Sequence, residues 1–255
     1  MERQVDMDKV VRQQIEMEEF FTGFAVREDR SAAPTSQSPG SGSQSATPPP
    51  RPEKTHDVAA LEAIAAEVLQ CRKCGLGSLR TNPVPGEGSP RARIMFIGEA
   101  PGADEDAQGR PFVGRAGQLL DKIIAACGLR RDEVFIGNIL KCRPPDNRDP
   151  RPEEIVNCLP YLQRQIEAIN PDVIVALGAH AAKTLLNTVK PIGQMRGQFQ
   201  EYYAGIGRPP IKLMPTFHPA YLLRNYSEQN RRYVWEDMKK VLTDLGLPVP
   251  NRSQS

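Results

Sequence analysis

From residue 58 onward, short continuous runs of apolar residues alternate with longer segments in which apolar residues recur at helical spacing. The short runs predict buried strands at 93–98, 133–138, 173–177 and 211–214. The longer segments predict helices at 58–70, 115–127, 152–169, 179–186 and 231–245. Strands that alternate with helices, each strand apolar along its length, are typical of a parallel sheet covered by helices on both faces. The sequence therefore predicts an α/β fold with a central four-stranded parallel sheet.

The first 55 residues have a different pattern. Residues 1–30 contain an amphipathic helix that is expected to run to about residue 27, with Val10, Met17, Phe21 and Phe24 on one side. Residues 31–55 are rich in Ser, Pro and Gly and nearly lack apolar side chains, which predicts a disordered linker. The globular domain is expected at 56–248, followed by a tail at 249–255.

Composition and charge narrow the class of protein. The chain has 255 residues, of which 39% are hydrophobic, and no apolar run approaches the ~20 residues of a membrane span. No signal peptide opens it, so a reducing, cytoplasmic location is expected. The net charge is +2, but residues 71–255 carry 26 basic and 19 acidic side chains. This excess suits a polyanionic partner such as nucleic acid, although it would also aid solubility.

Four of the five cysteines have the spacing of a metal centre. Cys71 and Cys74 form a C-x2-C pair, and Cys142 and Cys158 follow after 67 residues as a C-x15-C pair. Four cysteines can hold a zinc ion or an iron–sulfur cluster. The wide second pair favours a [4Fe-4S] cluster, with zinc as the open alternative. Cys127 lies on the apolar side of a predicted helix and is interpreted as a core residue.

Three predicted strands end in segments that do not look like simple connections. These segments are GEAPG at 98–102, the single residue Asn138, and FHPAYLLR at 217–224. Ligands of open parallel sheets bind beyond the carboxyl ends of the strands. The three segments are therefore expected to converge on one crevice.

These segments, together with GRPFVGRAGQLLD at 109–121 and GNILKCRPP at 137–145, closely resemble the family 4 uracil-DNA glycosylases. The resemblance covers about residues 71–245, in motif order and with the cysteine spacing of that family. It implies a three-layer α/β/α sandwich that acts as a monofunctional glycosylase on uracil-containing DNA, associated with the nucleoid when it acts. A monomer is the default expectation, since one enzyme engages one flipped base. It also implies a structural [4Fe-4S] cluster on the four spaced cysteines.

The resemblance assigns roles to the residues around the base. Asn138 would read the pairing edge of a flipped uracil, and Phe112 would stack on its ring. His218 would donate a hydrogen bond to uracil O2 as negative charge develops there. Some relatives in the wider superfamily have a water-activating Asp where this chain has Ala100. The role of Glu99 therefore stays open among orienting water, stabilising the sugar cation and holding the loop.

Further residues are expected to shape the pocket or to contact DNA. Gly98 and Gly102 would allow close approach of the backbone, and Glu105 would help to exclude the thymine methyl group. Leu222, Leu223 and Arg224 resemble a loop that enters the duplex, although a turn with buried leucines is the alternative. The candidates for phosphate contact are Lys141, Arg143, Arg148 and Arg151, with a solvated charged loop as the alternative. His56 is expected at the edge of the linker, and His180 is expected on the surface of a helix.

Two other functions are compatible with the same resemblance. A uracil-DNA binding relative that traps its substrate covalently carries a basic, His-containing insertion near the cluster, and residues 142–154 contain none. A polymerase-associated module would recognise uracil without cleaving it, and the presence of Asn138 and His218 disfavours it.

The N-terminal helix suggests a second partner. Gln14, Met17, Phe20 and Phe21 have the spacing Q-x-x-M-x-x-F-F of a sliding-clamp peptide. The linker would then be a tether that raises the local concentration of the enzyme at the clamp. An amphipathic helix that packs on the domain or on itself explains the same residues.

Overall fold

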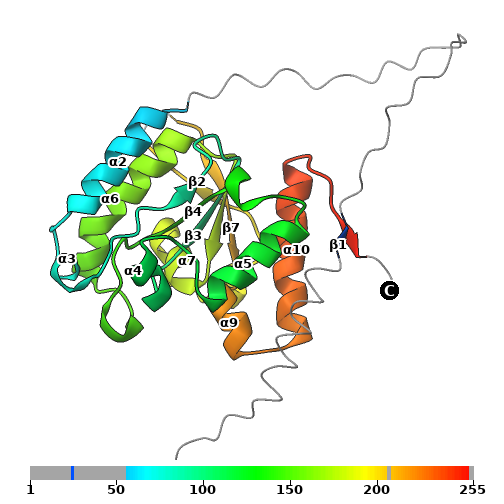
Figure 1. Cartoon of the computed structure of the whole chain (residues 1–255). Helices are drawn as coiled ribbons and strands as arrows, with labels where there is room; N and C mark the ends of the chain where they lie inside the picture. Colours follow the sequence, from blue (N-terminus) through cyan, green and yellow to red (C-terminus); the bar gives the residue numbers. More distant parts are fainter. Residues whose placement is uncertain (1–23, 26–55, 206–207, 253–255) are drawn as a thin grey trace, which may run out of the picture.

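The central sheet is built around the four predicted strands. The computed structural model describes residues 24–25, 56–205 and 208–252 (Figure 1). The sheet order is β2-β4-β3-β5-β7-β6. Its parallel centre consists of β3 (Ile94–Gly98), β4 (Phe135–Asn138), β5 (Val173–Leu177) and β7 (Ile211–Thr216). The predicted parallel pairing of these strands is confirmed.

The predicted number of strands is too low, because two short antiparallel strands extend the sheet to six. β2 (Glu87–Gly88) pairs with β4, and β6 (Gln200–Tyr202) pairs with β7. Each has at most three residues, lies at an edge and includes an exposed residue. Such strands lack the buried apolar run by which the central strands are recognised in the sequence.

Helices cover both faces of the sheet, which confirms the three-layer sandwich. The core on one face packs side chains of α5 (Arg115–Ala126), α9 (Pro219–Arg224) and α10 (Glu228–Asp244) against the sheet. The core on the other face uses α2 (Val58–Gln70), α6 (Pro152–Ile169) and α7 (Ala179–Leu186). Figure 1 shows α2 and α6 side by side on one side of the sheet and α5 and α10 on the other. Neighbouring residues of β3, such as Phe96 and Ile97, alternate between the two cores.

Short helices and turns fill several of the connections between the longer elements. They are α3 (Leu76–Leu79), α4 (Ala103–Gln108), α8 (Ile192–Met195) and the 3-10 turns η1 (Arg131–Glu133) and η2 (Pro145–Asn147). None of these elements is long enough to show a helical repeat in the sequence. Helix α10 begins three residues earlier than expected, because the Ser227 side chain accepts a hydrogen bond from the Asn230 amide and caps it.

The two ends of the described chain meet in a small ribbon. β1 (Phe24–Ala25) pairs antiparallel with β8 (Asn251–Arg252). At residues 24–25 the predicted amphipathic helix is therefore wrong, since backbone pairing with the chain end sets the conformation there. The rest of that helix, including the clamp-like motif and the linker, lies outside the described residues. Of the helices that the structure describes, none is long and apolar enough to cross a membrane.

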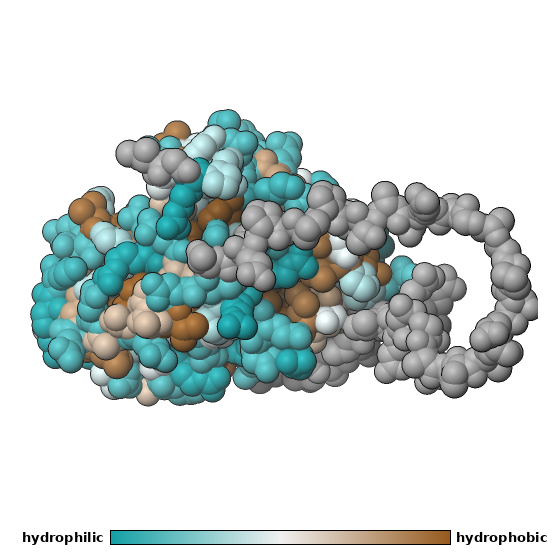
Figure 2. Space-filling model, turned by 90° about the horizontal axis from the view of Figure 1, so that it is seen from above, coloured by the Kyte–Doolittle hydropathy of each residue, from teal (hydrophilic) through white to brown (hydrophobic). Residues whose placement is uncertain are grey.

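The surface agrees with the composition. The face shown in Figure 2 is mostly hydrophilic, with apolar residues scattered between polar ones. The large hydrophobic side chains that are exposed, such as Leu79, Val156 and Val189, come from three separate elements or loops. Scattered exposed apolar residues are normal for a folded protein, so they define no binding patch by themselves.

Candidate active site

The three strand-end segments converge on one pocket, as predicted. The pocket has a volume of about 470 Å³ and is lined by Glu99, Asn138 and His218, each from a different strand end. Volumes of a few hundred cubic ångströms are typical of small-molecule sites. Three further segments that were not predicted also line it: the loop at 144–149, the first turn of α7 and Ile192 at the start of α8.

Asn138 faces this pocket from the end of β4 with an unpaired oxygen. Its side chain is 2% exposed, and Oδ1 has no hydrogen-bond partner among the described residues. Gly98, at the end of β3, pairs with Asn138 in the sheet. A Cβ atom at Gly98 would lie 2.4 Å from Oδ1 of Asn138 and 2.6 Å from Cζ of Phe112. Glycine at position 98 thus lets an amide and an aromatic ring approach each other, and the buried acceptor requires a donor from a ligand.

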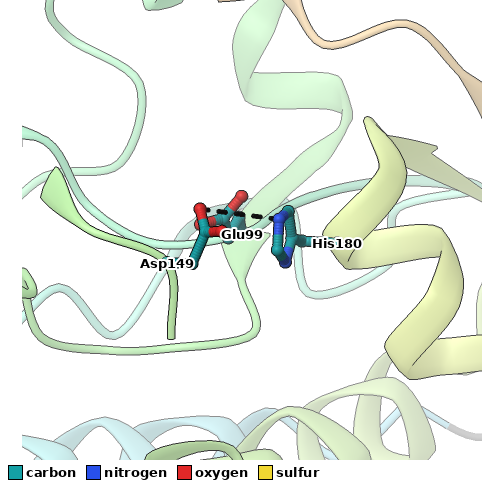
Figure 3. A group of neighbouring side chains, drawn as sticks. All are labelled: Glu99, Asp149 and His180. Atoms are coloured by element: carbon teal, nitrogen blue, oxygen red, sulfur yellow. Dashed lines mark ion pairs between the residues drawn. The ribbon is translucent and has the colours of Figure 1, made fainter. Parts of the chain in front are cut away.

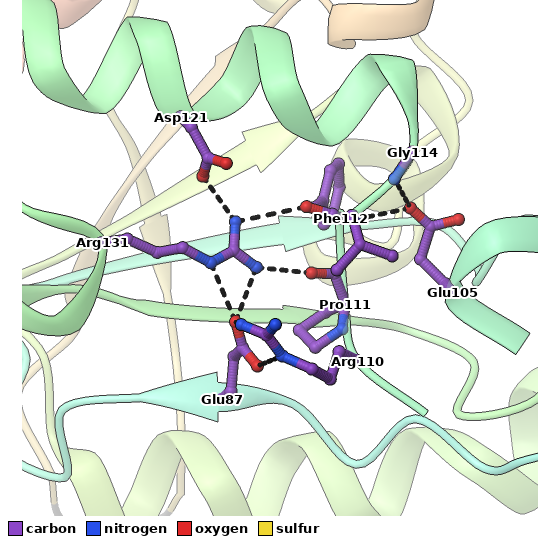
Figure 4. Close-up of polar contacts among 9 residues, drawn as sticks. Glu87, Glu105, Arg110, Pro111, Phe112, Gly114, Asp121 and Arg131 are labelled. Carbon is purple, nitrogen blue, oxygen red and sulfur yellow. Dashed lines mark hydrogen bonds and ion pairs between the residues drawn. The ribbon is translucent and has the colours of Figure 1, made fainter. Parts of the chain in front are cut away.

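Phe112 is held in an unusual backbone conformation by an arginine. Its φ is +51°, which non-glycine residues rarely adopt, and its ring is buried. The Arg131 guanidinium donates hydrogen bonds to the carbonyl oxygens of Pro111 and Phe112, at 2.5 and 3.2 Å. Arg131 is itself paired with Glu87 at 2.7 Å and with Asp121 at 2.6 Å (Figure 4). No sequence pattern identified Arg131, since its four partners come from three separate segments.

Glu105 joins the loop after β3 to the loop that carries Phe112. Its carboxylate accepts hydrogen bonds from the backbone amides of Val113 at 2.8 Å and Gly114 at 2.9 Å (Figure 4). It also accepts one from the Gly102 amide at 3.0 Å. These bonds fix the entry of α4 and the turn before α5. Glu105 also lines the pocket. Its expected role at the uracil C5 edge stays a prediction, whereas its contacts already give it a role in holding two loops.

His218 presents a neutral imidazole to the pocket. It caps α9, and Nδ1 accepts a hydrogen bond from the Ala220 amide at 3.0 Å. The ring proton therefore lies on Nε2, which is free to donate. Burial, assisted by the positive charge of Arg224, lowers the pKa of His218 to about 4. The ring lies 5.7 Å from that of Phe112, centroid to centroid, so the two rings border the same space.

Glu99 lies beside two residues that the sequence did not connect with it. It follows Gly98 directly and lines the pocket with Ala100, and both are half-buried. Asp149 and His180 approach Glu99 (Figure 3). His180 lies on the surface of a helix, as expected, with its side chain 45% exposed, but α7 begins at the pocket, so His180 also lines the site. The rule that strand ends form the site, applied also to the third predicted strand, would have found it.

Burial raises the pKa of the Glu99 carboxyl group. The positive charge of a protonated His180 opposes this effect, and the negative charge of Asp149 adds to it. Arg224 also lowers the pKa of Glu99. The protonation of Glu99 therefore depends on its two unexpected neighbours.

Two of the residues expected to contact DNA are buried. Leu222 is 1% exposed and is the residue by which α9 packs into the core, so the alternative of a buried leucine holds for it. Leu223 is partly exposed and Arg224 is exposed at the pocket. Lys141 is 1% exposed, with Nζ donating to the Asn138 carbonyl at 3.0 Å and to Oε1 of Gln165 at 2.7 Å. Its amine satisfies buried oxygens, so it is not a phosphate contact.

The other basic candidates are nearer to solvent. Arg148 forms a two-pronged ion pair with Glu154, at 2.5 and 2.9 Å, which already occupies its guanidinium. Arg143 is half-buried and contacts Asn147, whereas Arg151 is exposed. Phosphate contact stays a prediction for Arg143 and Arg151.

The four spaced cysteines meet at a second, small cavity. Cys71, Cys74, Cys142 and Cys158 line it together, and all four are free thiols. The backbone amide of Lys141 donates to the sulfur of Cys158 at 3.1 Å, and the Arg80 guanidinium donates to that of Cys142 at 3.0 Å. Such donors suit thiolate ligands of a metal centre. Cys127 lies in the core with α5, as predicted.

The pocket brings an amide, an imidazole and an aromatic ring to the carboxyl edge of a parallel sheet. In an α/β protein, such a set of groups suits a flat heterocycle with polar edges. The comparisons with known proteins define the family. The model of the Uracil DNA glycosylase superfamily matches residues 85–241, and the chain belongs to this superfamily.

Several curated relatives cover most of the described domain. A type-4 uracil-DNA glycosylase of Sulfurisphaera tokodaii is 49% identical over 186 residues, which are 71% of this chain and 83% of that protein. That of Saccharolobus solfataricus is also 49% identical, over 71% of this chain and 84% of its own. The type-4 enzyme of Thermotoga maritima is 49% identical over 182 residues, covering 92% of its length. The predicted membership in the type-4 family is confirmed.

Proposed function

We propose that this protein is a monofunctional uracil-DNA glycosylase, which hydrolyses the bond between uracil and deoxyribose and leaves an abasic site. The observation that carries the proposal is the buried, unpaired Oδ1 of Asn138, which faces the pocket beside Phe112 in a member of this superfamily. The target base lies inside the helical stack, so it must be flipped out of the DNA to reach such a pocket.

Asn138 reads the pairing edge of the base. Its Oδ1 accepts the N3–H of uracil, and its amide NH₂ donates to O4. Cytosine presents an acceptor at N3 and an amino group at position 4, so both contacts would oppose like groups. A buried amide left without partners costs about 1–3 kcal/mol per group, which makes this discrimination strong. Phe112 stacks on the face of the base at the same time.

His218 and Glu99 act on opposite products of bond cleavage. Breaking the glycosidic bond leaves negative charge on uracil and positive charge on the sugar. Nε2–H of the neutral His218 donates to uracil O2, and this bond strengthens as the charge develops. Glu99, in its ionised form, accepts a proton from the attacking water. Arg224, at the rim of the pocket, and the partly exposed Leu223 beside it in the sequence meet the DNA strand from which the base has left.

The cysteine-lined cavity fits a [4Fe-4S] cluster. Among the described residues, no three cysteine sulfurs lie within 4.8 Å of one another, whereas thiolates on one zinc ion, at Zn–S of about 2.3 Å, would be ~3.8 Å apart. The wider spacing and the two donors to sulfur favour a larger centre. When bound, the cluster would cross-link the segment after α2 to the segment after β4 and to α6. This role is structural, and it braces the wall that bears Lys141.

An end-labelled DNA oligomer with one uracil, and a thymine control, tests the activity. Alkali-dependent cleavage at uracil alone is expected, and Asn138→Ala and His218→Ala should reduce its rate by at least ~100-fold. A denaturant-resistant protein–DNA band would instead indicate covalent trapping. Binding of uracil-DNA with neither product would indicate a recognition module without turnover. Gel filtration of the same preparation tests whether the enzyme is a monomer.

The clamp-like motif at residues 14–21 supports a second, separate partner. Its binding to a sliding clamp stays a prediction, because the motif lies outside the described residues. A synthetic peptide of this segment, tested against purified clamp, would examine it independently of the glycosylase domain.

A further inference from the structure

Glu99, Asp149 and His180 form a cluster at one side of the pocket. Glu99 follows β3, Asp149 lies on the loop after η2, and His180 is the second residue of α7. One ligating atom from each lies within 4.8 Å of the other two (Figure 3). Among the described residues, no other three His, Cys, Asp or Glu side chains lie this close together. All three line the pocket, so the cluster faces the same space as Asn138 and His218.

The three groups are close enough to share one water molecule beside them. Nε2 of His180 and Oδ1 of Asp149 are 3.6 Å apart, which is too long for a direct hydrogen bond. A water that hydrogen-bonds to both atoms at about 2.8 Å would lie beside the line that joins them. Water has two O–H donors and two lone pairs. Two carboxylates can accept both donors, and an imidazole N–H can occupy one lone pair. The second lone pair is then the one part of the water that is free, and it points away from the cluster.

We propose that Glu99, Asp149 and His180 together hold the water that attacks C1′ of the deoxyribose, with His180 and Asp149 as positioning residues for Glu99 and its water. This inference rests on the proposed glycosylase function. The free lone pair forms the new O–C1′ bond while the C1′–N1 bond breaks, and uracil leaves with that electron pair. The water proton passes to the Glu99 carboxylate. No oxidant, reductant or metal takes part.

The charges around Glu99 make this arrangement sensitive to pH. Three charged groups face its carboxyl group: His180 from α7, Asp149 from the loop after η2, and Arg224 from α9. Burial raises the pKa of Glu99, and a protonated His180 opposes that rise. Glu99 must be ionised to accept the proton. An uncharged residue at position 180 therefore makes Glu99 harder to ionise. The acid limb of the rate profile, which is the range where the rate falls as the pH is lowered, should then move to higher pH.

Two substitutions at one position separate hydrogen bonding from charge. The rate of uracil release in a single turnover would be measured between pH 5 and 8.5 with the full chain. We expect His180→Ala to lower the rate on the pH plateau by about tenfold, the equivalent of one hydrogen bond of about 1.4 kcal/mol. His180→Gln keeps an N–H donor and should recover most of that rate. Both variants should shift the acid limb to higher pH, because both lack the cation.

The same substitution at His56 is a matched control. His56 contacts the Ile169 carbonyl and does not line the pocket, so His56→Gln should leave both the plateau and the acid limb unchanged. Thermal unfolding of each variant shows whether the fold is intact. A role of His180 in folding alone would lower the unfolding temperature but would not move the acid limb.

Several results would overturn the inference. One is a His180→Ala enzyme that is folded and has the wild-type plateau and acid limb. Another is loss of activity on treatment with a chelator, with the brown absorbance of the cluster unchanged, and recovery on adding a divalent cation. That result would assign the three side chains to a metal ion. Failure of the proposed function is distinct, since the wild-type protein would then release no uracil at any pH.

Discussion

Gly98→Ala tests the contact between the base reader and the stacking ring. In the wild type, the absent side chain at position 98 leaves space that Asn138 and Phe112 share. The new methyl group would lie 2.4 Å from Oδ1 of Asn138 and 2.6 Å from Cζ of Phe112. Neither group can move freely, because Asn138 is within a strand and Arg131 holds the backbone of Phe112.

The size of the effect follows from these distances. An ordinary contact of a Cβ atom is 3.4 Å or more, so the amide, the ring or both must retreat by about 1 Å. Overpacking of this kind typically costs about 1–3 kcal/mol of stability. A displacement of about 1 Å in an active site can reduce the rate about 100-fold. We therefore expect a folded protein with a modest loss of stability and a severe loss of uracil release.

Gly137→Ala is the matched control on the neighbouring strand. A Cβ atom there would have its nearest contacts at 3.6 Å from Phe135 and 3.8 Å from Lys141, which are ordinary distances. Its activity should remain within about threefold of the wild type, since no group of the pocket must move. Single-turnover uracil release and denaturant unfolding of both variants make the comparison.

One result would refute the reasoning. If Gly98→Ala released uracil as fast as Gly137→Ala, the amide and the ring would not need their observed separation. Asn138 and Phe112 would then not form a fixed site for the base. Equal and large losses of stability in both variants would instead show that the sheet centre tolerates no side chain at either position.

Three further predictions concern single groups. Arg131→Met should lower the free energy of unfolding by about 2–4 kcal/mol and raise KM, because two backbone carbonyls lose their donor. Arg130→Met, at an exposed neighbour, should leave the denaturation midpoint unchanged. In NMR titration, His218 should show a pKa near 4. Because this value is below that of an unfolded histidine, its contribution to stability should be lost as the pH falls from about 6.5 towards 4. Cys158→Ser should remove the visible absorbance and bound iron, whereas Cys127→Ser should retain both; equal absorbance in the two variants would exclude the four-cysteine centre.

The central elements could be predicted from the sequence because their signals are local. Strands such as 173–177 are continuous apolar runs, and helices such as 152–169 repeat apolar residues at helical spacing. The edge strands β2 and β6 gave no such signal, because their conformation comes from pairing with a neighbouring strand. The same holds for β1, where an apparent helix pattern yields to pairing with the chain end.

For the site, motifs identified most residues but not their surroundings. Asn138 and His218 were expected at strand ends and line the pocket. The burial of Lys141 was not predicted and that of Leu222 was only the alternative, since burial depends on what packs against a residue. In a sequence, a lysine such as Lys141 is expected at the surface. Its burial becomes understandable only in the structure, where the Asn138 carbonyl accepts a hydrogen bond from its amine.

The sequence by itself determined the α/β class, the family and the residue types that recognise a base, because local patterns and motifs identify all three. Tertiary structure alone decided which side chains from distant segments meet. It placed Arg131 under the backbone of Phe112 and brought His180 to Glu99. Such contacts join residues separated by up to about eighty positions, and no local periodicity encodes them. They arise because parallel strands end at one edge, where the segments that follow must pack together.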